Sequence, residues 1–171
     1  RRHPVRARGL RVQRILDALD PELAREARKP LVGYSDVTAL LLWQRRRAGL
    51  VGFHGPMLDY GDAIAPESFT ALLAQLQGQG ALPVRLQGKG LVAGSARGRL
   101  AGGNLSLVTA SLGTPWEIST RGTILVIEEV GERPYRIDRM LEQMRSAGKF
   151  EGLRGIAVGS LRGCTDDRYP E

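Results

Sequence analysis

Ser35 has the sequence setting best suited to covalent chemistry. Pro30 ends any preceding helix, residues 31–34 form a short β-prone run, and helical spacing of apolar residues begins after Asp36. A serine on such a strand-to-helix turn has its hydroxyl lifted clear of the sheet, and the first free N–H groups of the helix can stabilise negative charge on an attacked carbonyl. Ser35 is therefore a candidate nucleophile, although a serine or aspartate at this position is more often a simple helix N-cap.

The acidic pair Glu128 and Glu129 is a second candidate, because it follows four apolar residues, 124–127. Functional groups of α/β folds gather at the carboxyl ends of strands, and a carboxylate there can orient a catalytic histidine. Adjacent strand residues point to opposite faces, so only one of the two can address the site of Ser35. The alternative is that both are exposed carboxylates paired with nearby arginines, namely Arg133, Arg136 or Arg139.

Two further groups give weaker indications of chemistry. His54 ends an apolar run, and a single histidine in that setting is more often a hydrogen-bonded core residue than a base or a ligand. Residues 102–104, Gly-Gly-Asn, resemble a backbone anion cradle at a helix start. They lack the lysine and the spacing of a P-loop, so the sequence gives little support for nucleotide binding.

Composition excludes several classes of protein. With 171 residues, 42% of them hydrophobic, the chain can bury one substantial core or two small ones. No apolar run approaches the roughly 18 residues of a membrane span, and no signal peptide is recognisable, so we expect a cytoplasmic protein without membrane association. Cys164 is the single cysteine, which excludes a disulfide framework and a cysteine-based zinc site.

The net charge of +7 is located at the N-terminus. The first fourteen residues hold six arginines and no acid, so the remainder of the chain carries only +1. No aromatic or helical recognition pattern accompanies these arginines, and we therefore predict no nucleic-acid partner. They are Arg1, Arg2, Arg6, Arg8, Arg11 and Arg14.

The pattern of apolar residues predicts an α/β fold. A strand, a helix and a second strand within about 25 residues form a parallel crossover. A Gly/Gln-rich break at 77–80 places a domain boundary after residue 76, giving domains 1–76 and 77–171. The expected helices are 9–19, 21–28, 36–48, 66–76, 104–112 and 134–147, and the expected strands are 31–34, 50–54, 83–87, 98–101, 123–128 and 153–160.

Five segments, taken together and in this order, resemble the LD-carboxypeptidase family of serine peptidases, the muropeptide LD-carboxypeptidase and microcin-immunity group. The resemblance extends over roughly residues 12–164. The segments are PLVGYSDVTAL from Pro30, FHGPM from Phe53, GGNLSL from Gly102, GTPWE from Gly113 and ILVIEEVGERPYRIDRML from Ile124.

The resemblance implies a fold, a site and a substrate. The fold would be a flavodoxin-like parallel-sheet N-terminal domain and a smaller α/β C-terminal domain, both incomplete. The site would be a Ser–Glu–His triad without metal or cofactor, in which Ser35 is the nucleophile, Glu128 is the triad acid and the Asp36 backbone N–H is an oxyanion-hole donor. Such enzymes are homodimers that release D-alanine from murein tetrapeptides in the cytoplasm during cell-wall recycling. The alternative within this chemistry is a microcin-type immunity hydrolase that cleaves a peptidyl-nucleotide.

Two departures from the family pattern limit these implications. The family's triad histidine lies in a later Gly-His segment that this sequence does not contain, and neither His3 nor His54 matches it. The family's glycine-rich oxyanion loop aligns with residues 7–11, where only Gly9 is retained. We therefore expect the sequence to be a fragment, and a remnant without catalysis is the third hypothesis.

Overall fold

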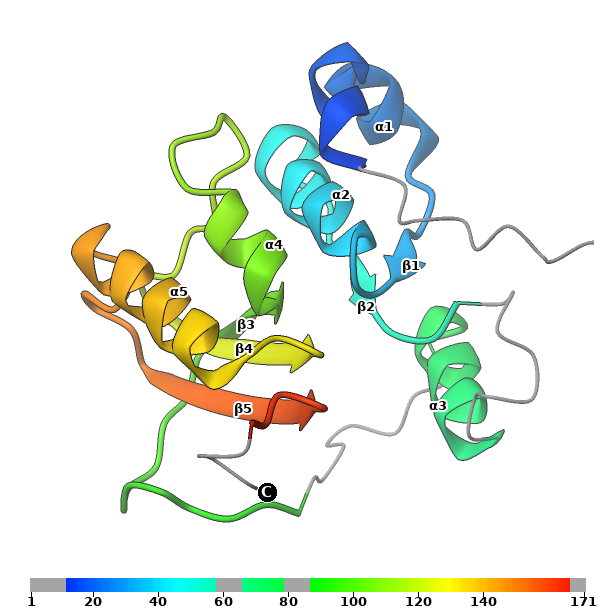
Figure 1. Ribbon diagram of the computed structural model, residues 1–171. Coiled ribbons are helices and arrows are strands. Elements are labelled where there is room, and N and C mark those ends of the chain that lie inside the picture. The colour runs from blue at the N-terminus through cyan, green and yellow to red at the C-terminus, as the bar shows by residue number, and fades with distance from the viewer. Residues whose placement is uncertain (1–11, 58–65, 79–86, 167–171) are drawn as a thin grey trace, which may run out of the picture.

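A computed structural model of the chain describes residues 12–57, 66–78 and 87–166 (Figure 1). The N-terminal part comprises a 3-10 helix η1 (Val12–Ala18), α1 (Pro21–Ala27), β1 (Val32–Gly33), α2 (Val37–Trp43) with its π-helical continuation η2 (Gln44–Ala48), β2 (Phe53–His54) and α3 (Pro66–Leu76). The C-terminal part comprises β3 (Arg99–Asn104), α4 (Leu105–Ala110), β4 (Thr123–Val130), α5 (Pro134–Ser146) and β5 (Gly155–Arg162).

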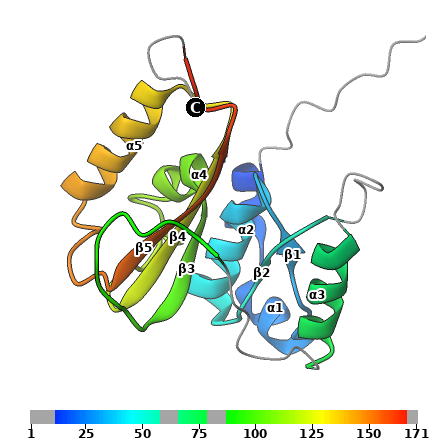
Figure 2. The ribbon, with the colours of Figure 1, turned by 90° about the horizontal axis from the view of Figure 1, so that it is seen from below.

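All strand pairs in the described residues are parallel, as predicted for an α/β fold. Strand β1 pairs with β2, and a second sheet has the order β3-β4-β5. The two sheets lie side by side with β2 nearest β3 (Figure 2). The strand predicted at 83–87 falls almost entirely outside the described residues, and the domain boundary after residue 76 stays a prediction.

The predicted helix boundaries rest on local capping. Asp20 accepts a hydrogen bond from the Glu22 N–H at 2.8 Å and so caps α1, which has proline at its first position. Gly49 adopts φ +74° and ends the helix that follows Ser35. The last part of that helix, η2, is π-helical, which the spacing of apolar residues does not predict.

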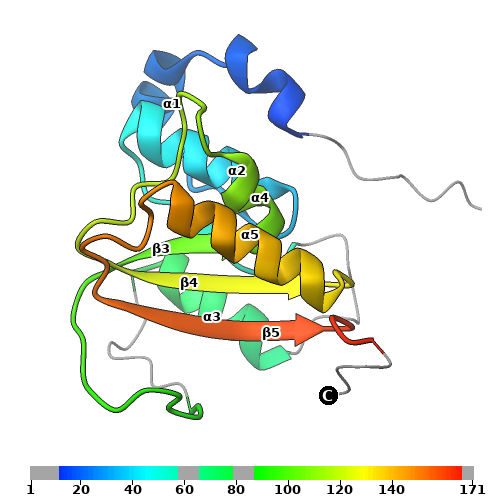
Figure 3. The same cartoon turned by 60° about the vertical axis from the view of Figure 1, so that its left-hand side comes forward.

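The core lies between the β3-β4-β5 sheet and the helices that cover one of its faces. Leu125 and Ile127 of β4 pack with Leu105 and Met144, which come from α4 and α5 (Figure 3). Leu42 of α2 joins this cluster, so α2 packs against the C-terminal sheet as well as its own strand. A smaller cluster on the other side of α2 contains Leu16, Ala39, Trp43 and Trp116. Of the described helices, none is long and apolar enough to cross a membrane.

Glycine is required at residue 102, where β3 lies against β4. A Cβ on Gly102 would lie 1.7 Å from the carbonyl oxygen of Val126, and the backbone φ is +142°, which other residues rarely adopt. The close contact is with backbone, so no side-chain rotation can relieve it.

We expect Gly102→Ala to destabilise the fold by about 3 kcal/mol or more, because it combines a backbone clash with an unfavourable φ. Thermal unfolding should then occur about 6–12 °C lower, since 1 kcal/mol shifts the midpoint of a chain of this size by roughly 2–4 °C. Gly88→Ala is the matched control, because a Cβ there has no atom within 4 Å. Equal unfolding midpoints for the two variants would contradict this account of β3.

Candidate active site

Candidate functional residues lie at or near the carboxyl ends of four parallel strands. Ser35 follows β1, His54 ends β2, Asn104 ends β3 and Glu128 lies near the end of β4. In register, His54 is level with Gly33, and Glu128 is level with Asn104. The carboxyl edge of parallel strands is where α/β folds bind ligands, so the topology by itself brings these side chains together.

Ser35 is held on a strained turn. Its φ is +54°, an unusual value for a residue other than glycine, and the residue is exposed. Gly33 makes the sharp turn possible, because a Cβ on it would lie only 2.5 Å from Val37 Cγ1. Strained backbone clusters at functional sites, and a strand–turn–helix with serine at its tip is the geometry of an exposed nucleophile.

The start of α2 leaves one backbone N–H near this serine without an acceptor among the described residues. Asp36 occupies the N-cap position, but its side chain makes no capping bond; Asp36 Oδ2 instead accepts from the Val12 N–H at 2.7 Å. The Thr38 N–H donates to the Ser35 carbonyl oxygen at 2.9 Å. Within the described residues, the Asp36 N–H has no acceptor, and the Ser35 hydroxyl makes no capping bond.

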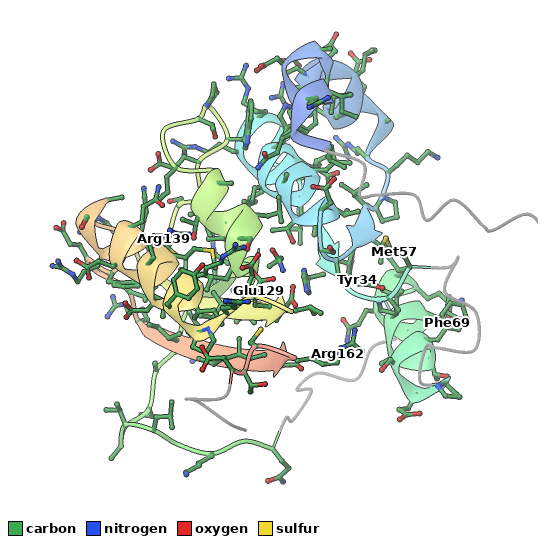
Figure 4. All side chains as sticks on the ribbon, viewed as in Figure 1. Tyr34, Met57, Phe69, Glu129, Arg139 and Arg162 are labelled. Atoms are coloured by element: carbon green, nitrogen blue, oxygen red, sulfur yellow. The ribbon has the colours of Figure 1, made fainter. Side chains whose placement is uncertain are left out.

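Glu129 points toward the helices and is fully engaged there (Figure 4). It is 4% exposed, and its carboxylate accepts from Asn104 Nδ2 at 2.8 Å, the Ser106 N–H at 2.9 Å, Ser106 Oγ at 2.7 Å and the Val130 N–H at 2.9 Å. The helix start after residues 102–104, which resembled a cradle for an external anion, is thus occupied by the protein's own carboxylate. Asn104 also caps α4 as predicted, since its Oδ1 accepts from the Leu107 N–H.

Glu128 points to the opposite face, toward β2. Its Oε1 lies 3.7 Å from His54 Nε2, is buried, and has no hydrogen-bond partner among the described residues. Burial raises the pKa of Glu128, the adjacent charge of Glu129 raises it further, and the Asn104 side chain partly opposes both effects. The alternative that both acids are exposed and pair with nearby arginines is wrong. Glu129 is buried and held by Asn104 and Ser106, and the ion-pair partner of Glu128 among the described residues is His54.

His54 lies at the protein surface and not in the core. Its side chain is 35% exposed, and partial burial lowers its pKa below the ordinary histidine value. At neutral pH the ring is therefore mainly uncharged and carries one N–H donor. Sequence reasoning favoured a hydrogen-bonded core residue over a base or a ligand at His54, although the place of His54 at a strand end was an available indication of the site.

Comparison with known proteins gives the context for this edge. The sequence matches the LD-carboxypeptidase N-terminal domain over residues 7–55 and the LD-carboxypeptidase C-terminal domain over residues 97–171. The chain belongs to the LD-carboxypeptidase family. This confirms the family that the five sequence segments indicated.

Individual LD-carboxypeptidase relatives agree with the family match. A probable murein peptide carboxypeptidase of Bacillus subtilis is 42% identical over 162 residues, which is 91% of this chain and 50% of the relative. The crystal structure of a muramoyltetrapeptide carboxypeptidase from Oxalobacter formigenes superposes with a TM-score of 0.78 at 28% identity, covering 90% of this chain and 53% of that one. The microcin C7 self-immunity protein MccF of Escherichia coli is 29% identical, covering 85% of this chain and 52% of the relative. The chain thus spans about half the length of the relatives it matches.

A polar hollow lies away from the carboxyl ends of these strands. It measures about 400 Å³ and lies at the amino end of β4, whereas Ser35, His54, Asn104 and Glu128 lie at or near the carboxyl ends of their strands. Lys149 and Glu117 form an ion pair in its wall, which lowers the pKa of Glu117. Its lining includes Arg46, Thr114, Thr120 and Arg121.

Proposed function

We propose that this chain carries the nucleophile and the triad acid of a serine LD-carboxypeptidase that releases the terminal D-alanine of murein tetrapeptides. The observation that carries the proposal is the strained, exposed turn at Ser35, which follows the carboxyl end of β1, while Glu128 lies near the carboxyl end of β4 in the neighbouring sheet. The names of the Bacillus subtilis and Oxalobacter formigenes relatives support the murein peptide as the substrate.

The proposed reaction is acyl transfer through Ser35. Its Oγ attacks the carbonyl carbon of the L-to-D bond, while the triad histidine implied by the family resemblance takes the hydroxyl proton. Glu128 holds that histidine in the required tautomer, and the Asp36 N–H donates to the oxyanion. The proton then passes to the D-alanine nitrogen as the peptide bond breaks, and water hydrolyses the acyl-enzyme to free Ser35.

The position of Asp36 fits the role of an oxyanion donor. Its N–H belongs to the residue after the nucleophile, and the three N–H groups that follow it, from Val37 to Ala39, are already bonded to carbonyl oxygens of the turn. A donor fixed in this way requires no reorganisation when negative charge develops on the carbonyl oxygen. The second donor would come from the glycine-rich loop, which aligns with residues 7–11 and lies outside the described residues.

A microcin-type immunity hydrolase is the second candidate, since the relative MccF is named for that function. Both candidates use the same Ser35 chemistry and differ in what they bind. A cytoplasmic location and a homodimer are further parts of the proposal, and both rest on the family resemblance.

Substrate choice is tested with a completed chain. Residues 12–166 replace the matching residues of the Bacillus subtilis relative, which then supplies the flanking segments, including the glycine-rich loop and triad histidine that the resemblance implies. We expect the completed chain to release D-alanine from murein tetrapeptide, which is measured by chromatography. We expect it to leave a peptidyl-nucleotide uncleaved. Preferential cleavage of the peptidyl-nucleotide would favour the immunity function, and cleavage of neither substrate would contradict the proposal.

A further inference from the structure

Glu128 Oε1 is in an unusual position for a carboxylate oxygen. It is buried and has no hydrogen-bond partner among the described residues. An unsatisfied buried acceptor is costly, so native structures seldom retain one without a role. The nearest cation-forming group is His54 Nε2, at 3.7 Å.

The surroundings of His54 direct its ring toward this oxygen. Gly103 has no side chain, and a Cβ there would lie 3.4 Å from His54 Nδ1 and 2.7 Å from Thr38 Cγ2. The glycine therefore lets α2 and β2 approach the end of β3 closely. Thr38 fixes this approach, because its Oγ1 accepts from the Asn104 N–H at 3.2 Å.

We propose that His54 is a positioning residue that donates its Nε2–H to Glu128 Oε1 and thereby keeps the triad acid oriented. The separation of 3.7 Å is longer than a hydrogen bond, and such contacts tighten when substrate binds. A carboxylate has two oxygens, so Oε2 is left to accept from the triad histidine. The inference rests on the proposed function for Glu128, because a residue that orients an acid needs that acid to act.

Few charged groups lie close enough to His54 to affect the titration of its ring. Among the described residues, Glu128 is the one carboxylate within 4.0 Å of its ring. Glu129 lies next along β4 but points to the other face, where Asn104 and Ser106 hold it. Glu128 is also the ion-pair partner of His54 among the described residues, so we expect removal of its charge to change the titration of His54.

The contact can be tested without activity, in the 171-residue chain. The chain has two histidines, His3 and His54, so His54→Gln assigns both ring proton resonances in a nuclear magnetic resonance titration. A carboxylate near an imidazole favours its charged form, so Glu128→Gln should lower the pKa of His54 further. Glu132→Gln, which removes a half-buried carboxylate paired with Arg136, is the matched control and should leave the pKa of His54 unchanged. An unchanged titration midpoint in Glu128→Gln would overturn the inference.

The positioning role is tested by kinetics in the completed chain. His54→Leu should lower kcat roughly 10- to 100-fold with little change in KM, the loss typical when a group that orients a catalytic residue is removed. His54→Gln retains an N–H donor at the same reach and should recover most of kcat. Equal losses in both variants would overturn the inference and would indicate that His54 acts as a base. If the completed chain itself released no D-alanine, the proposed function would fail, while the titration would still decide whether His54 contacts Glu128.

Discussion

Ser35→Ala in the completed chain will abolish release of D-alanine from murein tetrapeptide, with a loss of roughly 10⁶-fold in kcat. The loss should be this large because alanine offers no nucleophile, while the other groups of a triad act only through the serine. Since the alanine side chain is smaller and the turn already places a Cβ at this position, the fold should be retained.

The control for this variant is Ser119→Ala, which removes an exposed serine in the wall of the polar hollow at the amino end of β4. It should leave both kcat and the unfolding midpoint unchanged. Comparable activity in Ser35→Ala and Ser119→Ala would show that Ser35 is not the nucleophile, provided that circular dichroism finds both variants folded.

Glu128→Gln and Glu129→Gln will separate activity from stability. Glu128→Gln should lower kcat roughly 10³- to 10⁴-fold, because a neutral amide no longer stabilises the charged triad histidine or fixes its tautomer. Its unfolding midpoint should change little, since Oε1 of this residue makes no hydrogen bond in the described part of the chain.

Glu129→Gln should have the reverse effect. Its carboxylate accepts four hydrogen bonds from Asn104, Ser106 and Val130, and an amide can accept on one atom only. We expect destabilisation by about 1–3 kcal/mol, with kcat per folded molecule within a few-fold of the unmodified protein. A larger loss of kcat in Glu129→Gln than in Glu128→Gln would show that Glu128 is not the triad acid.

The sequence predicted the parts of the site that depend on local geometry. Pro30, Gly33 and the helical spacing after Asp36 predicted a serine on a strand-to-helix turn, and the turn is present. The alternation of side chains along a strand predicted that Glu128 and Glu129 point to opposite faces, which the structure confirms.

Contacts between distant segments were not predictable in this way. The binding of Glu129 by Asn104 and Ser106 joins residues 23–25 positions apart, and depends on how α4 packs over the sheet. The approach of His54 to Glu128 depends on β2 lying beside β3, although the two strands share no hydrogen bonds. Apolar periodicity predicts elements and their buried faces, but it does not specify which element ends meet.

The roles proposed for Ser35 and Glu128 require side chains from two sheets to act together. Their side chains belong to different sheets, which α2 joins through its contacts with β3 and α4. The triad acid and the nucleophile would therefore be aligned by packing, and substitutions in α2 should affect both.

The most direct test is D-alanine release by the 171-residue chain itself, compared with its Ser35→Ala variant and with the completed chain. A serine hydroxyl is a weak nucleophile at neutral pH unless a base removes its proton, and neither histidine of this chain matches the triad position. The account predicts no release above the Ser35→Ala background from the 171 residues, and Ser35-dependent release from the completed chain. Robust Ser35-dependent release from the 171-residue chain would contradict it, and would show that another base removes the proton, with His54 as the first candidate to test.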